Sequence, residues 1–236
     1  VALPPGEEGI TALAYDATNG TVYGLTMPTG SLLALDCVSG ELRTIARIQT
    51  AAPVLAVLPD GTVLGAQADG QFWRYTPADR ELVPLDAAAP CQKGKRHVAG
   101  VQSLVVSSSG TVFGGTSTDG YLFSYDLVNG TVLNHGKPNR QSNIRALVEG
   151  HDGLIYGVVE EPQGMAHLFT YNPATHAFTD LGVVGASFPE HWIAHSIGSM
   201  SVGPFGEIFL GETDSISHLF IYYPPIPRQP PRARPG

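Results

Sequence analysis

Short runs in which apolar and polar side chains alternate recur along the chain. The clearest is a five-residue segment that ends in tyrosine, found at 71–75, 121–125, 167–171 and 218–222. An alternation with a period of two is typical of β-strands whose two faces meet different surroundings. No helical period is sustained, so the pattern predicts an all-β protein.

A second motif shows that these strands belong to a repeat. A glycine followed by strand-forming residues recurs five times, beginning at Gly20, Gly61, Gly110, Gly153 and Gly206. The spacing averages about 46 residues, which is typical of β-propeller repeats. In the first unit we expect strands at 10–15, 21–26, 31–35 and 41–48, separated by turn residues. Four short antiparallel strands per unit, repeated five times, predict a β-propeller.

The repeat defines the expected domain organisation. One propeller domain is expected over 1–223, with repeats near 10–50, 51–98, 99–140, 141–192 and 193–223. The last repeat lacks a segment for its fourth strand, and we expect Val1 to Leu3 to supply it, so that the paired chain ends close five four-stranded blades into a ring. If the chain is a fragment, the native ring is larger. Residues 224–236, rich in proline and arginine, are expected to form a linker that could attach a protein partner or a further domain.

Over residues 10–223 the repeat resembles propeller repeats of the NHL, virginiamycin-B-lyase-like and Kelch types. The sequence has no Trp-Asp dipeptide of the WD40 kind, and no double glycine recurs from repeat to repeat as it does in Kelch repeats. The resemblance implies a fold, and it carries over no catalytic residues.

Composition excludes several functions. A net charge of −8 argues against a nucleic-acid partner, and no stretch reaches the roughly 18 to 20 apolar residues needed to span a membrane. The first residue, Val1, fits either removal of a signal segment or a fragment of a longer chain; we favour a secreted or periplasmic location.

Strand direction divides the loops between two faces. The loops that enter the first strand of each unit and those that join its second and third strands must share one face, here called the loop face. The remaining tight turns lie on the opposite turn face. The loop-face segments are long and rich in charged and aromatic residues, so we expect the functional site there.

Most of the candidate residues lie in these loop-face segments. The expected catalytic residues are His195, His191, Arg145 and Tyr121, and the expected substrate-binding residues are Arg140, Lys93, Arg96, His97, Gln102, Asn143, Trp192, Glu212 and Asp214. Arg145 is the one charged member of an aligned first-strand row that also contains Thr11, Pro53, Gln102 and Gly198, so it should point into the central channel. The alternative is that Arg145 only pairs with a neighbouring carboxylate such as Glu149. The equivalent positions of His167 and His218 favour a structural role for both.

No cofactor is expected. His191, His195 and Glu212 offer one candidate set of ligands for a divalent metal. However, histidines four apart on an extended segment lie about 13 Å apart, which argues against a shared ion.

Two functions remain. The first is a carbohydrate-active enzyme, most concretely a polysaccharide lyase that acts by β-elimination on an acidic, uronate-containing glycan. Arginine would neutralise the carboxylate, histidine would remove a proton and tyrosine would protonate the leaving oxygen. The second is a non-catalytic module that binds a glycan or a protein, with Trp73 and Trp192 as stacking platforms. The concentration of polar residues in the third to fifth units favours a single site.

Overall fold

The computed structural model describes residues 2–48, 51–98, 100–187, 190–213 and 216–225. Blade one contains β1 (Gly9–Asp16), β2 (Thr21–Met27), β3 (Ser31–Asp36) and β4 (Leu42–Arg47), and blade two contains β5 (Ala51–Val57), β6 (Val63–Gln67), β7 (Gln71–Thr76) and β8 (Glu81–Ala88). Blade three contains β9 (Val101–Val106), β10 (Val112–Thr116), β11 (Leu122–Asp126) and β12 (Thr131–Gly136), and blade four contains β13 (Asn143–Glu149), β14 (Ile155–Glu160), β15 (His167–Asn172) and β16 (Ala177–Val183). Blade five contains β19 (Ile197–Val202), β20 (Ile208–Glu212) and β21 (Leu219–Tyr222).

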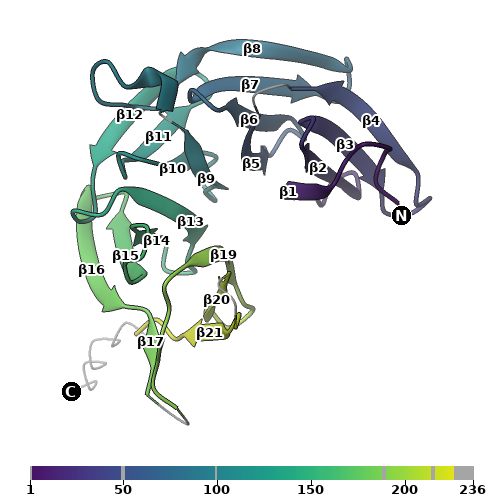
Figure 1. The fold of residues 1–236 in the computed structure, drawn as a ribbon. Helices are drawn as coiled ribbons and strands as arrows, with labels where there is room; N and C mark the ends of the chain where they lie inside the picture. Colours follow the sequence, from purple (N-terminus) through teal and green to yellow (C-terminus); the bar gives the residue numbers. More distant parts are fainter. Residues whose placement is uncertain (1, 49–50, 99, 188–189, 214–215, 226–236) are drawn as a thin grey trace, which may run out of the picture.

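The five blades are antiparallel sheets in which consecutive strands are neighbours. They follow one another around a central axis, with the first strand of each blade innermost (Figure 1). A hairpin of β17 (Gly185–Ala186) and β18 (Trp192–Ile193) connects blade four to blade five. The predicted fold class, an all-β five-blade propeller, is confirmed. In the described part of the chain, no helix is long and apolar enough to cross a membrane.

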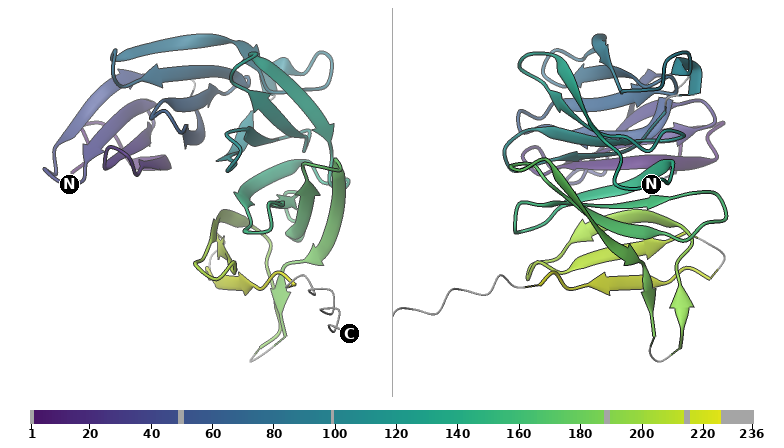
Figure 2. Two further views of the ribbon diagram at one scale, coloured as in Figure 1. Left: turned by 180° about the vertical axis from the view of Figure 1, so that it is seen from behind. Right: turned by 90° about the vertical axis from the view of Figure 1, so that its left-hand side faces the viewer.

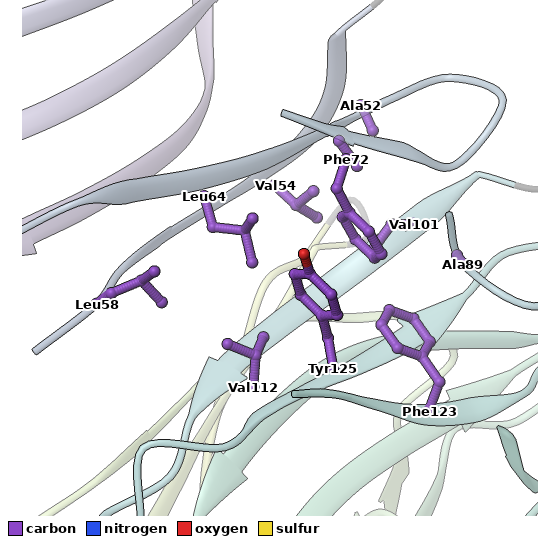
Figure 3. Packing of buried hydrophobic residues seen from close by; sticks show 11 residues of the cluster. Ala52, Val54, Leu58, Leu64, Phe72, Ala89, Val101, Val112, Phe123 and Tyr125 are labelled. Atoms are coloured by element: carbon purple, nitrogen blue, oxygen red, sulfur yellow. The ribbon is translucent and has the colours of Figure 1, made fainter. Parts of the chain in front are cut away.

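Apolar side chains are buried between neighbouring blades, because the faces of adjacent sheets pack against each other. One cluster joins blades two and three and includes Leu64, Phe72, Phe123 and Tyr125 (Figure 3). Similar clusters join blades one and two, three and four, and four and five. Alternate residues of one strand therefore face the preceding and the following blade, which explains the apolar side chains on both faces of the third strands.

The repeated glycines have two separate structural reasons. The leading glycine adopts a positive φ in the turn before the second strand, as at Gly110 with φ 83°, which residues with a Cβ rarely adopt. The following glycine makes room for a ring of the third strand. A Cβ at Gly65 would lie 2.0 Å from Trp73, and one at Gly114 would lie 2.2 Å from Phe123.

The predicted closure by the chain ends is not found, and this corrects the sequence-based expectation. Ala2 and Leu3 form no strand, Val1 lies outside the described residues, and the fifth sheet has three strands. The N-terminal segment is instead fastened to blade one. The Glu8 N–H donates to Met27 O at 2.8 Å, and the Glu7 carboxylate accepts hydrogen bonds from Thr29 and Ser31. The blades form an arc with blades one and five at its ends (Figure 2).

The division into two faces agrees with the hydrogen bonds. The Ser117 N–H, after β10, donates to Gly100 O before β9 at 2.9 Å, and the Thr213 N–H, after β20, donates to Ser196 O before β19 at 3.0 Å. Each bond joins an entry loop to the turn between the second and third strands. In blades three and five, the entry loop and the turn between the second and third strands therefore lie at the same end of the blade.

Candidate functional site

The loop face of blade five contains a buried carboxylate that joins three segments. The Glu212 side chain, at the end of β20, has no exposed surface. It accepts hydrogen bonds from Trp192 Nε1 at 3.1 Å, from the His218 backbone N–H at 3.1 Å and from His218 Nδ1 at 2.6 Å. The Trp192 and His218 rings also pack together, with centroids 4.4 Å apart. The hairpin, β20 and the start of β21 therefore meet at one carboxylate.

This contact fixes the orientation of His218. Because a carboxylate only accepts hydrogen bonds, the proton of the neutral imidazole lies on Nδ1, and Nε2 carries the lone pair. The His218 side chain is 39% exposed, and no described residue hydrogen-bonds to Nε2. The arrangement is a histidine held in one tautomer by a buried carboxylate, and it can take up or release a proton at Nε2.

A second buried carboxylate lies between blades four and five. Glu160, at the end of β14, lies 3.2 Å from Arg145 Nε, and it accepts hydrogen bonds from Ser196 Oγ at 3.3 Å and from the Ile197 N–H at 3.2 Å. Burial raises the pKa of Glu160, an effect that Arg145 and the two hydrogen bonds oppose. Thr213 Oγ1 donates to Ser196 Oγ at 3.1 Å. Since Thr213 follows Glu212, the two carboxylates belong to one connected polar region.

The partner of Arg145 differs from the carboxylate suggested by the sequence. Glu149 does not pair with it, but accepts hydrogen bonds from the Ser108 N–H and Oγ. Arg145 is near the loop-face end of β13 and Glu149 is at its opposite end, whereas Glu160 lies on the adjacent strand opposite Asn143. The antiparallel neighbour is therefore closer than a residue four positions along the same strand.

The innermost strands surround a central cavity of about 320 Å³. Its lining includes the whole row predicted from the alignment, namely Thr11, Pro53, Gln102, Arg145 and Gly198. In each blade this position lies at an irregularity in the pairing of the first and second strands, where the register shifts. Such a bulge redirects one side chain out of the pleat, so Arg145 and Gln102 reach the cavity from blades four and three.

The other predicted residues lie at several places on the loop face. His195 is exposed and its Nδ1 lies 3.0 Å from Gly164 O, while His191 is exposed in the hairpin. Asn143 begins β13, and among the described residues its buried Oδ1 has no hydrogen-bond partner. Tyr121, half-buried, precedes β11 in blade three. Asp214 lies outside the described residues.

Apart from Arg145, the predicted basic residues do not join the Glu212 region. Lys93 is exposed in the connection between blades two and three, and Arg96 and His97 lie in a 3-10 turn, Arg96–Val98, of the same connection. Arg96 donates to Ala89 O at 2.5 Å. Arg140 is exposed before blade four. The positive charge is thus spread along the loop face between blades two and four.

Sequence reasoning missed His218 as a functional candidate, because its place in the repeat resembles that of His167. The two differ in their carboxylate partners. His167 Nδ1 lies 3.5 Å from the half-exposed Asp180, whereas His218 contacts the buried Glu212. The sequence did contain a signal for this pair: Glu212 and His218 flank the turn between two antiparallel strands, which places them opposite each other.

Within the described residues, no three His, Cys, Asp or Glu side chains are grouped so that they could hold a metal ion. Two wide hollows lie on the turn face. One of about 580 Å³ lies between blades one and two and one of about 780 Å³ lies between blades two and three. Both are wide grooves beside Asp60 at the ends of tight turns, whereas the buried Glu160 and Glu212 carboxylates are on the loop face.

No family model matches this chain, and no curated protein matches it. Solved structures match it by fold. Virginiamycin B lyase from Staphylococcus aureus is 10% identical with a TM-score of 0.70, and the match covers 96% of this chain and 74% of that chain. A catalytically inactive histidine-to-alanine variant of the same lyase, with quinupristin, is 11% identical with a TM-score of 0.69 and the same coverage. The extracellular domain of the hybrid two component system BT4673 from B. thetaiotaomicron is 16% identical with a TM-score of 0.65, and the match covers 89% of this chain and 27% of that chain.

The chain therefore spans about a quarter of the length of the BT4673 chain. Because the match covers 74% of the lyase chain, about 80 lyase residues lie outside it. This is the length of roughly two propeller repeats. At these identities the similarity concerns the fold alone, and the chain has the fold of β-propellers such as virginiamycin B lyase.

Proposed function

We propose that the loop face of blades four and five is the active site of a lyase, in which His218 transfers the proton of a β-elimination. The observation that carries this proposal is the contact between the buried Glu212 carboxylate and His218 Nδ1 at 2.6 Å. Two of the solved structures with this fold are virginiamycin B lyases, and the one with a histidine changed to alanine is catalytically inactive. Those facts belong to that lyase, and they support acid–base chemistry here by analogy of fold.

The proposed substrate is an acidic glycan that contains uronate. His218 Nε2 removes the proton on the carbon next to the carboxylate, that electron pair forms a carbon–carbon double bond, and the bond to the leaving oxygen on the next carbon breaks. The leaving oxygen takes a proton from water. Arg145, with a third of its side chain exposed beside Gln102 and the central cavity, would bind the substrate carboxylate in competition with Glu160.

A second candidate function is non-catalytic glycan binding. The packed rings of Trp192 and His218, whose planes are tilted by 47°, favour it, since partly exposed aromatic rings bind the apolar faces of sugars. In that case the hydrogen bonds to Glu212 only fix the shape of a binding platform.

The experiment compares His218→Gln with His191→Gln on a panel of acidic and neutral polysaccharides, and follows the ultraviolet absorbance of unsaturated uronate products. His218→Gln should reduce the rate at least about 100-fold, the scale of a lost general base. His191→Gln, in the exposed hairpin, should leave it nearly unchanged. Full activity of His218→Gln would refute the acid–base role, and binding without product formation would favour the second candidate.

A further inference from the structure

The two ends of the arc expose apolar positions that the inner blades bury. In the third strand, the residue after the initial polar position faces the following blade, at Leu32, Phe72, Leu122, Leu168 and Leu219. Four of these are 0%, 0%, 0% and 5% exposed, but Leu219 in blade five is 66% exposed. Ile221, on the same side of β21, is 45% exposed. Blade five thus has an uncovered face, here called the trailing face.

Blade one has the complementary uncovered face. In the first strand, Leu55 and Leu147 pack toward the preceding blade and are 8% and 7% exposed. The equivalent Leu13 is 63% exposed, and Tyr15, two residues later, is 59% exposed. These residues define the leading face of blade one.

The two uncovered faces are the two halves of one interface. At each of the four inner junctions, the trailing face of one blade packs on the leading face of the next. The surface that fits Leu219 is therefore a leading face with a leucine like Leu55, and the surface that fits Leu13 is a trailing face with a residue like Phe72. Both surfaces exist on blades of this repeat type.

Blade five also lacks an outer strand among the described residues. Beside β21 lies an apolar groove of about 310 Å³, lined by Val183, Val184, Leu219 and Ile221 among others. A strand placed there would cover the free edge of β21, as fourth strands cover the other blades. The uncovered edge and the uncovered face adjoin, so one partner can cover both.

We propose that this arc binds further propeller blades of the same repeat type, about two of them, between the trailing face of blade five and the leading face of blade one. The number follows from the lyases that share the fold, which exceed the matched region by about 80 residues. The first added segment also provides the fourth strand of blade five. This proposal does not rest on the proposed function.

The experiment supplies such blades from the chain itself. A copy of residues 37–140 is inserted after Tyr223, which adds a strand equivalent to β4 for blade five and then copies of blades two and three. In the original chain Leu219→Lys and Leu13→Lys should lower the melting temperature by less than about 2 °C, because both side chains are largely exposed. In the extended chain each should lower it by about 5 °C or more, because a lysine then enters an apolar junction.

Leu133→Lys is the matched control, since Leu133 is 56% exposed on β12, an outer strand; it should have the same small effect in both chains. With a shorter insertion of 37–88, Leu219→Lys should lower the melting temperature by about 5 °C or more, whereas Leu13→Lys should lower it by less than about 2 °C. The reason is that this insertion covers the trailing face of blade five but not the leading face of blade one.

Equal effects of Leu219→Lys in the original and extended chains would overturn the proposal, as would failure of both extended chains to fold. The original chain is also examined for its mass in solution. A dimer that Leu219→Lys dissociates would show that a second copy covers the face, and this too would overturn the proposal.

Discussion

Carboxylates occupy both ends of the blades, but their surroundings are opposite. On the turn face, Asp36 and Asp126 accept hydrogen bonds from the backbone N–H groups two and three residues later. On the loop face, Glu160 and Glu212 are buried and accept hydrogen bonds from other segments. Asp36 and Asp126 thus act within a few residues of sequence, whereas Glu160 and Glu212 join parts of the chain that only the tertiary structure brings together.

The pKa directions show the same contrast. Hydrogen bonds from the backbone of Ser39 and Val38 lower the pKa of Asp36, and the Asn129 side chain and backbone lower that of Asp126. Burial raises the pKa of Glu160. The turn carboxylates are therefore stabilised in their charged form, while the environment of Glu160 favours its neutral form. The burial that raises the pKa of Glu160 disfavours its charged form, which Arg145 and the hydrogen bonds from Ile197 and Ser196 partly offset.

The largest expected effect comes from Glu212→Ala. This change leaves the Trp192 indole N–H and the His218 imidazole without their buried acceptor, and it creates a cavity. We expect the free energy of unfolding to fall by about 3 kcal/mol, measured by chemical denaturation. Asp126→Ala on the turn face is the comparison and should cost clearly less, because water replaces the lost acceptor. Equal losses would mean that the two faces do not differ as described.

Glu160→Gln should produce a smaller effect that depends on pH. Because the folded pKa of Glu160 lies above its unfolded value near 4.5, the unfolded state releases its proton first as the pH rises. The stability of the native protein should therefore fall as the pH increases from that value through the folded pKa. In Glu160→Gln this decrease should be absent, as followed by denaturation at several pH values. A variant that keeps the same pH profile would show that Glu160 is not the group responsible.

The smallest effect, with the opposite sign, is expected for Asp126→Asn. The pKa of Asp126 is lowered in the folded state, so its stabilisation is present above the unfolded pKa and is lost as the pH falls through the folded pKa. The variant should lose stability slightly near neutral pH and change less than the native protein upon acidification. A thermal melting series at low ionic strength measures this difference. Greater loss at acid pH than at neutral pH would contradict the assignment.

Much of the fold followed from the sequence because its causes are local. The alternation at 167–171 predicts the strand His167–Asn172, and Gly110 predicts the turn before Val112–Thr116. The row containing Gln102 and Arg145 was also placed correctly at the central cavity. These inferences need only the strand period, the requirement for a positive φ and the reversal of direction at each turn.

The site itself was predicted less completely. The sequence predicts a loop-face site that includes Glu212, which stays a prediction, whereas His218 was interpreted as structural and Glu160 was not expected to pair with Arg145. Pairing of a side chain depends on which residue of the adjacent strand lies opposite, and bulges shift that register in the innermost strands. The sequence shows the repeat but not this shift.

The sequence by itself determined the repeat, the all-β class and the division into a turn face and a loop face, because each depends on residues that are close along the chain. Only the tertiary structure decided which carboxylate meets which partner and that, within the described residues, the N-terminal segment does not pair with β21. Those outcomes depend on which groups already have hydrogen-bond partners. The N-terminal segment, for example, is hydrogen-bonded to Met27, Thr29 and Ser31 of blade one. They also depend on whether another blade is present to cover a face such as that of Leu219.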